Sequence, residues 1–329
     1  MAEVDQSLKV LGHENVAVIG CGVIGRSWAT VFARAGANVR VYDAVADAAA
    51  TVPEKIREDL SGLGLDAGEV EAVVTRIVPA GSLEDAVAGA GWVQESVAEE
   101  AAIKRNLFEA LDPAAPEDCI LASSCSSIPP ADFLGGLAGE RRALIVHPFN
   151  PPHLIPLVEL VASPKTAGET VERAKATIEA VGMVPVDVLK PVVGFIGNRL
   201  QAAVINEAMH LVADGVASPE DIDATLSIGL GRRWALMGPF ETMDLNADGG
   251  VGEYMAKFGE AYAAMGAELH VGEGWPGQAV TKVVSARRRA LSIDQLPARR
   301  AWRDQALMKL NRLVDEARSS EADPRERRR

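Results

Sequence analysis

The sequence has little cysteine, few aromatic residues, no long apolar run and too few basic residues to balance its acids. The three cysteines, Cys21, Cys119 and Cys125, have neither the spacing of metal ligands nor the even number of a disulfide framework. We therefore expect no metal site and a reducing environment. No apolar run is long enough to form a membrane helix, so we expect no association with a membrane.

The formal net charge is −13, and this excess of acids disfavours nucleic acid as a partner. Residues 1–6 lack the positive charge and the apolar core of a signal peptide. Composition and charge together predict a soluble, cytoplasmic protein.

At 329 residues the chain suits two domains. Short β-rich runs alternate with helical patterns over residues 16–188, as in an α/β fold with a Rossmann-type, doubly wound parallel sheet. The stretch Lys190–Gly194 has the composition of a hinge, and beyond Phe195 the pattern is helical. We expect a dinucleotide-binding domain over residues 1–190 and an all-helical substrate and dimerisation domain over residues 191–329. The helical part has more apolar surface than a small domain can cover, which favours a homodimer.

A glycine-rich turn lies between the first β-rich run and a helical stretch. It reads Gly20-Cys21-Gly22-Val23-Ile24-Gly25, and Asp43 follows 18 residues after its last glycine. In a dinucleotide site Gly20 allows the tight turn, Gly22 lets the backbone approach the pyrophosphate and Gly25 allows close helix–strand packing. An acid at Asp43 accepts hydrogen bonds from the ribose and repels a 2′-phosphate. The pattern predicts NAD rather than NADP, bound by Gly20, Gly22, Val23, Ile24, Gly25 and Asp43; the alternative is a glycine-rich turn of an unrelated α/β protein.

His147 directly follows the apolar run Ala143–Val146, which is typical of a buried strand. Ligands of an open α/β sheet gather outside the carboxyl ends of its strands. The chain then returns through Leu157–Val161, a β-rich run with Glu159 at its centre. A buried acid needs a partner, and a histidine paired with an acid is held in one tautomer. We interpret His147 and Glu159 as a catalytic pair; the alternative is a structural histidine and a solvent-facing acid.

Polar residues follow two other strand-like runs. Ser126 lies in a serine-rich cluster after one run, and Glu99 and Lys104 follow another. We interpret all three as candidate site residues, and the alternatives are helix caps, serine turns and ordinary charges on a helix face. Cys125 has no neighbour in the sequence that would activate it, so we expect it to be a packing residue.

Two residues of the second half are further candidates. Asn198 stands at the start of a long helical pattern, next to the hinge, and its alternative role is that of a capping or core amide. Arg233 lies in a stretch that the glycines around it identify as a loop, as does the stretch 237–241. We expect Arg233 to hold a substrate carboxylate in a bidentate contact; its alternative is a surface or interface arginine.

The motifs resemble those of the 3-hydroxyacyl-CoA dehydrogenase superfamily over nearly the whole chain. The residues that carry this resemblance are Gly20-x-Gly22-x-x-Gly25, Ser126-Ser127, His147-x-x-Asn150-Pro151, Glu159, Gly194-Phe195, Asn198-Arg199 and Met237-Gly238-Pro239. The resemblance implies a Rossmann domain, an all-helical dimerising domain, NAD as the cofactor and a small hydroxy acid as the substrate.

The resemblance also implies roles for individual residues. His147 is paired with Glu159, and Ser126 and Asn198 donate hydrogen bonds to the substrate. It places Glu99 and Lys104 near the nicotinamide, and we expect Asn150 to contact the substrate as well.

The reaction that these residues imply is the oxidation of a secondary alcohol at the 3-position of an acid, with L-gulonate as the first candidate. His147 would take the hydroxyl proton, and Glu159 would stabilise the imidazolium. An acyl-CoA substrate is an alternative, but residues 44–80, which have a helical pattern, are short and acidic, and this disfavours its phosphates. Carnitine is another alternative, although an aromatic content of 5% disfavours a cage for its ammonium group. The alternative outside enzymes is an NAD-binding structural or redox-sensing protein.

Overall fold

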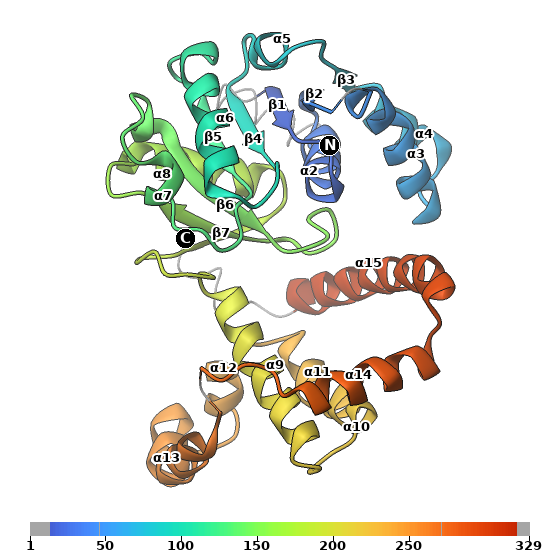
Figure 1. Ribbon diagram of the computed structural model, residues 1–329, viewed down its shortest axis with the longest axis vertical. Helices are drawn as coiled ribbons and strands as arrows, with labels where there is room; N and C mark the ends of the chain where they lie inside the picture. Colours follow the sequence, from blue (N-terminus) through green and yellow to red (C-terminus); the bar gives the residue numbers. More distant parts are fainter. Residues whose placement is uncertain (1–13, 46, 271, 321–329) are drawn as a thin grey trace. The chain divides into compact units, whose positions relative to one another are not determined.

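The computed structural model describes residues 14–45, 47–270 and 272–320. The chain divides after Arg199 into two compact units (Figure 1). The predicted boundary after residue 190 falls before helix α9 (Gly197–Ala213), in which this division occurs. Among the described residues no helix has the length and apolar character needed to span a bilayer. The segment 1–6, in which no signal peptide is expected, lies outside the described residues.

An eight-stranded sheet forms the centre of the first unit, in the order β3-β2-β1-β4-β5-β6-β7-β8. Strands β1 to β6 are parallel, in the order of a dinucleotide-binding sheet. Strand β7 pairs antiparallel with β6, and β8 runs parallel to β7. The strands are β1 (Asn15–Ile19), β2 (Asn38–Tyr42), β3 (Ile77–Pro79), β4 (Trp92–Glu95), β5 (Ile120–Ser123), β6 (Ala143–Pro148), β7 (Leu157–Ala162) and β8 (Val184–Asp187).

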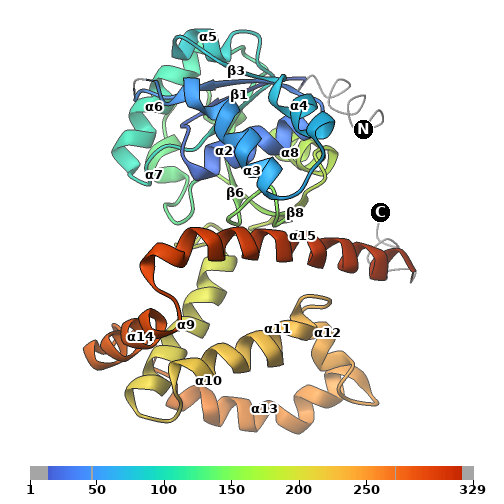
Figure 2. The same cartoon turned by 90° about the vertical axis from the view of Figure 1, so that its right-hand side faces the viewer.

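Helices cover both faces of this sheet (Figure 2). Successive residues of a strand point to opposite faces, so Val16 and Val18 of β1 join one core while Ala17 and Ile19 join the other. The first core packs against α2 (Val23–Arg34), α3 (Val52–Gly62), α4 (Ala67–Val74) and α8 (Gly168–Ala180). The second packs against α5 (Leu83–Val87), α6 (Ala101–Ala114) and α7 (Ala131–Leu134). Burial on both faces explains why β1, β5 and β6 contain continuous apolar runs, whereas β2 alternates, with Asn38 and Arg40 exposed and Val39 and Val41 buried.

The second unit continues α9 and is helical throughout its regular elements. Its helices are α10 (Pro219–Ala224), a wider-turned helix η3 (Thr225–Leu230), α11 (Gly231–Trp234), α12 (Pro239–Asp244), α13 (Gly250–Glu268), α14 (Gly277–Ala290) and α15 (Leu296–Ser320).

The structure corrects three local predictions. Residues 44–80 contain the strand β3 as well as helices. The helical pattern hid this strand, because three residues are too short a run to show the period of a strand. The stretches 229–234 and 237–241 are mostly helical rather than loops, so Arg233 belongs to α11. Gly231 is a close-packing residue and not a helix breaker, since a Cβ there would lie 2.6 Å from the carbonyl oxygen of Leu226. His147 lies within β6 rather than beyond it, because β7 extends the ladder to Pro148.

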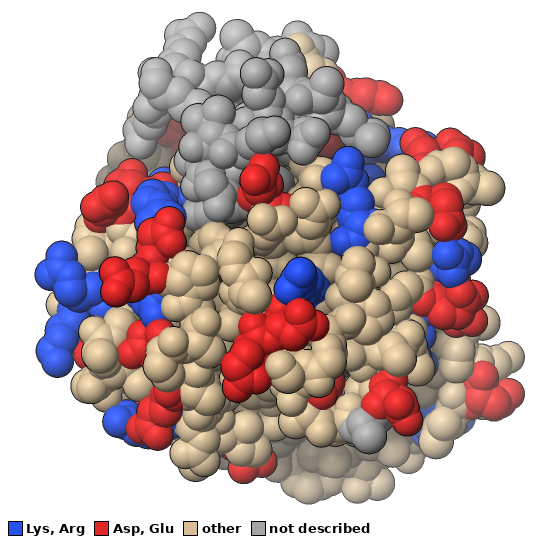
Figure 3. All heavy atoms as spheres, turned by 90° about the horizontal axis from the view of Figure 1, so that it is seen from above, with Lys and Arg blue, Asp and Glu red and all other residues tan. Residues whose placement is uncertain are grey.

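Basic and acidic side chains are interspersed on the face drawn in Figure 3. Exposed side chains of the first unit form ion pairs: Arg40 with Asp85 at 3.0 Å, and Arg57 with both Glu54 and Glu71. Exposed pairs of this kind contribute about 0–1 kcal/mol each. They therefore shape the surface charge more than the stability.

Candidate active site

The glycine-rich turn has the shape that a dinucleotide needs. Gly20 has φ +99°, and a Cβ on it would lie 2.5 Å from the carbonyl oxygen of Ser96. A Cβ on Gly25 would overlap the carbonyl oxygen of Gly20, whereas nothing lies within 4 Å of a Cβ on Gly22. The first and third glycines are thus required by the protein's own packing. The space around the second is open, so a pyrophosphate can approach the backbone there.

Asp43 stands beside this turn at the end of β2. Its Oδ2 accepts a hydrogen bond of 2.7 Å from the backbone N–H of Cys21, and its Oδ1 accepts one of 2.8 Å from Val45. Val23 and Ile24 form the first turn of α2, which contains no acid to oppose a phosphate. The predicted cofactor residues Gly20 to Gly25 and Asp43 are therefore brought together, and the open cradle at Gly22 fits NAD.

His147 and Glu159 face each other across the antiparallel ladder of β6 and β7. The Nδ1 of His147 lies 2.7 Å from Oε2 of Glu159. Both residues are buried, at 6% and 1% exposure. The rings of Phe149 and Phe195 pack on the imidazole with centroids 5.6 Å from it. The carboxylate can only accept, so Nδ1 carries the hydrogen and Nε2 is left with its lone pair.

The other oxygen of Glu159 is held by the entry to helix α9. The N–H groups of Ile196 and Gly197 donate to Oε1 at 2.8 and 2.9 Å. The preceding residues Gly194 and Phe195 have φ of +76° and +50°, and this turn aims both N–H groups at the carboxylate. Burial raises the pKa of Glu159, but the hydrogen bonds from His147 and from these two N–H groups outweigh it and hold the pKa below its ordinary value.

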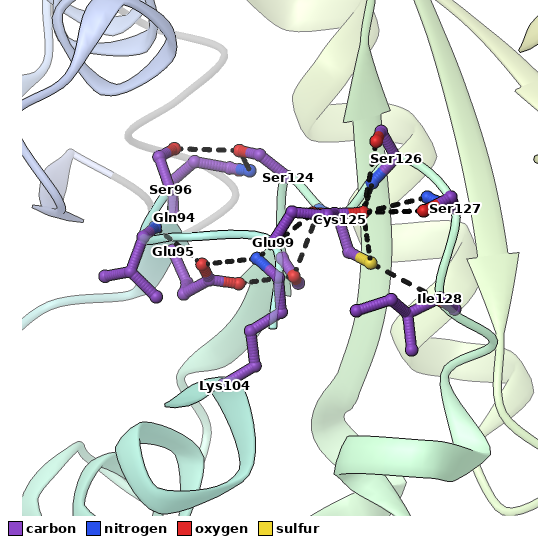
Figure 4. Close-up of polar contacts among 12 residues, drawn as sticks. Gln94, Glu95, Ser96, Glu99, Lys104, Ser124, Cys125, Ser126, Ser127 and Ile128 are labelled. Carbon is purple, nitrogen blue, oxygen red and sulfur yellow. Dashed lines mark hydrogen bonds and ion pairs between the residues drawn. The ribbon is translucent and has the colours of Figure 1, made fainter. Parts of the chain in front are cut away.

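Glu99 organises the serine cluster after β5 (Figure 4). Its Oε1 accepts from the N–H and hydroxyl of Ser126 at 2.7 and 3.0 Å, and from those of Ser127 at 2.9 and 3.2 Å. The amide of Asn198 donates to the carbonyl oxygen of Ser126 at 2.9 Å. The structure thus brings together Ser126, Glu99 and Asn198. Sequence alone did not indicate that the Ser126 hydroxyl faces Glu99.

Lys104 is a buried ion-pair partner rather than a charge on a helix face. Only 1% of its side chain is exposed, and its Nζ lies 2.8 Å from Oε1 of Glu95 and 3.6 Å from Oε2 of Glu99. Glu95, at the end of β4, also accepts from the N–H of Val97 at 2.7 Å and from the hydroxyl of Ser123. Sequence reasoning missed Glu95. The signal was available, since an acid within a strand-like run, costly to bury without a partner, was the feature that identified Glu159.

These contacts keep Glu99 ionised. Burial raises its pKa, but the hydrogen bonds from Cys125, Ser126 and Ser127 and the charge of Lys104 bring it below the ordinary value. The negative charge of Glu99 also disfavours ionisation of the Cys125 thiol. Burial, the larger cause, and the charge of Glu99 together raise the pKa of Cys125 to about 12. A thiol with that pKa is not a nucleophile at neutral pH, as the packing role requires.

Two predicted residues stand apart from these contacts. Asn150 is exposed in the loop after β6. Arg233 belongs to the second unit, where it is exposed and its side chain forms no hydrogen bond or ion pair with another described residue.

The protein combines a dinucleotide cradle with an imidazole that lies beside a buried carboxylate and has its Nε2 free. This combination is typical of nucleotide-dependent alcohol oxidoreductases, in which a base takes the hydroxyl proton. Residues 15–192 match the model of the 3-hydroxyacyl-CoA dehydrogenase NAD-binding domain, and residues 194–283 match that of its C-terminal domain. The chain belongs to the 3-hydroxyacyl-CoA dehydrogenase family and is an NAD-dependent dehydrogenase.

Individual relatives agree with this assignment. The lambda-crystallin homolog of Bos taurus is 42% identical over 305 residues, which cover 91% of this chain and 95% of that protein. An L-carnitine dehydrogenase of Streptomyces griseus is 39% identical over 262 residues, covering 78% and 77%. The crystal structure of 5-formyl-3-hydroxy-2-methylpyridine 4-carboxylic acid 5-dehydrogenase, an NAD⁺-dependent dismutase, superposes with a TM-score of 0.79 at 30% identity and covers 92% of this chain and 99% of that one. The predictions of family, fold class, enzymatic activity and NAD are confirmed.

Proposed function

We propose that the protein oxidises the 3-hydroxyl of a small hydroxy acid, with L-gulonate, converted to 3-dehydro-L-gulonate, as the first candidate. The observation that carries the proposal is the 2.7 Å contact between His147 and Glu159. It holds the imidazole in the tautomer whose Nε2 can accept a proton.

In the proposed reaction His147 Nε2 takes the proton of the substrate hydroxyl, and the ionised Glu159 stabilises the imidazolium. Bound NAD supplies the acceptor for the hydride that leaves carbon. The Asn198 amide uses one N–H on Ser126 and has a second to donate to the substrate oxygen. The Ser126 hydroxyl can turn from Glu99 toward the same oxygen, and both donors favour the charge that develops there.

Charge around α3 and α4 supports a free acid over an acyl-CoA. A CoA carries phosphates that need unpaired basic side chains. These two helices carry five acids against two bases, Lys55 and Arg57, and Arg57 is already paired with Glu54 and Glu71. The excess of acid leaves little attraction for a phosphate. We propose Arg233 as the carboxylate clamp, because its exposed guanidinium forms no hydrogen bond or ion pair with the described residues.

A panel of L-gulonate, L-carnitine and 3-hydroxybutyryl-CoA, assayed with NAD, tests the substrate class. We expect kcat/KM to be highest for L-gulonate. Carnitine is the second candidate because of the 39% identity to the L-carnitine dehydrogenase. Higher kcat/KM on the thioester would overturn the proposal, and no turnover on any alcohol would favour an NAD-binding structural or redox-sensing role.

Arg233→Lys tests the clamp, since lysine keeps the charge but loses the bidentate fork. We expect a loss of about 2 kcal/mol, roughly 30-fold in kcat/KM, on the sugar acid and little change on the thioester. Arg232→Lys, at the neighbouring exposed arginine of α11, is the matched control. An equal loss on both substrates would rule out the clamp.

We further propose a homodimer in the cytoplasm. The second unit exposes many large apolar side chains, among them Phe240 at 71% and Leu313 at 59%, and such surface usually meets a partner. All three cysteines are buried free thiols, as in a reducing compartment. Sedimentation equilibrium should give twice the chain mass of 34.7 kDa.

A further inference from the structure

A second cluster of nitrogen and oxygen ligands lies in the helical unit. His210 stands on α9, and Asp214 follows one turn later. His270 and Glu273 lie in the segment between α13 and α14. One ligand atom each from His210, His270 and Glu273 lies within 4.8 Å of the other two. None of these residues takes part in the proposed reaction.

His210 has an unused lone pair inside the protein. Only 4% of the residue is exposed. Its Nδ1 lies 2.9 Å from the carbonyl oxygen of Asn206. A carbonyl only accepts, so Nδ1 is the protonated nitrogen and Nε2 is an acceptor. This Nε2 is buried without a hydrogen-bond partner, and such a group is costly in a native structure unless something satisfies it. A cation would do so.

The distances fit a small transition-metal ion. Glu273 Oε2 lies 3.6 Å from His210 Nε2 and 3.3 Å from His270 Nδ1. The carboxylate oxygen and the Nε2 lone pair of His210 are both acceptors, so the 3.6 Å separation between them is not a hydrogen bond. Two ligand atoms bound tetrahedrally to zinc at about 2.0–2.2 Å are about 3.3–3.6 Å apart. The two edges that join Glu273 Oε2 to the imidazoles therefore have the length required in such a site, and the third pair of ligand atoms lies within 4.8 Å.

One ring must turn for all three to bind. The imidazoles of His210 and His270 are stacked, with centroids 4.1 Å apart and planes 7° apart. A metal lies in the plane of the imidazole that binds it, so two parallel rings cannot share one ion. His210 is fixed by burial and by Asn206, whereas the side chain of His270 is 37% exposed and its contacts to Glu273 and Asp214 are 3.3 Å or longer, so His270 is the ring that turns. Binding of a metal ion thus requires only that the His270 ring rotates out of its stack with His210.

Outer partners of the kind found at metal sites are also present. A metal-binding histidine usually donates its other N–H to a carbonyl or a carboxylate. His210 has the carbonyl of Asn206 at hydrogen-bond distance. For His270 the nearest such group is Oδ2 of Asp214, 3.7 Å from Nε2, which can accept from the ring only after the ring has turned. The same segment is held on α9 by a 2.8 Å hydrogen bond from Trp275 Nε1 to Asn206 Oδ1.

We propose that His210, His270 and Glu273 bind one divalent transition-metal ion of the zinc class, with water in the fourth position. The ion ties the segment between α13 and α14 to helix α9. The prediction of no metal was based on cysteine spacing. The relevant sequence signals were a histidine and an acid four residues apart, and a second histidine and acid three apart.

The test uses full-length protein freed of metal by a chelator and dialysis. Calorimetric titration with ZnCl₂ should give one ion per chain, and Zn²⁺ should raise the melting temperature. Co²⁺ should give the intense visible absorption of a four-coordinate site rather than the weak bands of the hydrated ion. Absence of saturable binding, or only weak six-coordinate bands, would overturn the proposal.

Variants assign the binding to these residues. His270→Ala and Glu273→Gln, at accessible positions that should not impair folding, should abolish the stoichiometric binding and the Zn²⁺-dependent rise in melting temperature. Asp214→Asn should weaken binding roughly 10-fold to 100-fold. His153→Gln and Glu260→Gln, which remove a histidine and a carboxylate elsewhere, are the matched controls and should bind as the wild type does. Undiminished binding in His270→Ala and Glu273→Gln would place the ion elsewhere and refute the site.

Discussion

At the residue scale, two buried glutamates carry the organisation of the first unit. Glu159 has one oxygen on His147 and the other on the N–H groups before α9. Glu95 holds Lys104, and Lys104 in turn faces Glu99. Removing one partner of a buried pair typically costs about 3–5 kcal/mol, because the other charge is left without compensation. Each acid therefore keeps its partner, because a buried carboxylate without one would destabilise the folded protein.

His147→Gln should separate binding from chemistry. Glutamine cannot take the hydroxyl proton, so we expect turnover to fall by roughly 10²–10⁴-fold. NAD affinity should be unchanged, because the glycine-rich turn and Asp43 are on other strands. Initial rates and calorimetric titration with NAD measure the two quantities. Turnover close to that of the wild type would remove His147 from the mechanism.

Asp43→Asn tests the choice between the two nicotinamide cofactors. The amide oxygen can still accept from one of the two N–H groups, of Cys21 or Val45, that Asp43 binds, but the charge is lost. Two like charges about 4 Å apart in water repel by about 1 kcal/mol, so the preference for NAD over NADP should shrink at least about fivefold. The ratio of kcat/KM with the two cofactors measures it. An unchanged ratio would contradict the ribose role of Asp43.

At the element scale, the start of α9 and the β6–β7 ladder jointly build the catalytic pair. The antiparallel register places His147 opposite Glu159. The left-handed turn at Gly194 and Phe195 then brings the first N–H groups of α9 to the same carboxylate. A shift of either element would move the imidazole, since Phe195 also packs on its ring.

Gly197→Ala should disturb this junction. A Cβ on Gly197 would overlap the ring of Phe149, which packs on His147. We expect kcat to fall by up to about 100-fold, the cost of a misplacement of about 1 Å at a reacting group. Gly252→Ala, in α13 with nothing within 4 Å of the new Cβ, is the matched control and should keep full activity. Equal activity of the two variants would show that Phe149 yields without moving His147.

At the scale of the whole molecule, the ionised glutamates link stability to pH. Glu99 and Glu159 both have pKa values below the ordinary 4.5. A carboxyl whose pKa is lowered on folding stabilises the protein fully above its unfolded pKa, and this contribution is lost as the pH falls through the folded pKa. The protein should therefore be least stable on the acid side.

Glu99→Gln should reduce the loss of stability in acid. We expect the unfolding free energy of the wild type to fall between about pH 5 and about pH 3, and to fall less in the variant, which has lost one of the linked groups. Urea unfolding at the two pH values measures this. Glu58→Gln, at an exposed carboxylate of α3, is the control and should behave as the wild type does. If the unfolding free energy of the variant fell in acid as much as that of the wild type, Glu99 would be excluded as a linked group.

The sequence by itself determined those features that depend only on residues close together along the chain. The glycines of the turn, the apolar strand runs and the acid after β2 follow from backbone sterics and burial along a short stretch. The order of domains and the pairing of a strand-end histidine with the next strand's acid could be read in the same way. Family membership followed because these motifs recur in one order along the chain.

Only the tertiary structure decided contacts between residues far apart in the chain. Nothing local shows that Lys104 is buried against Glu95, that Ser126 faces Glu99, or that the N–H groups of Ile196 and Gly197 meet Glu159. The same holds for His210 and His270, which come from segments 60 residues apart in the numbering and stack in space. Packing sets such contacts, since a charge or a lone pair removed from water must find whichever partner the fold brings within reach.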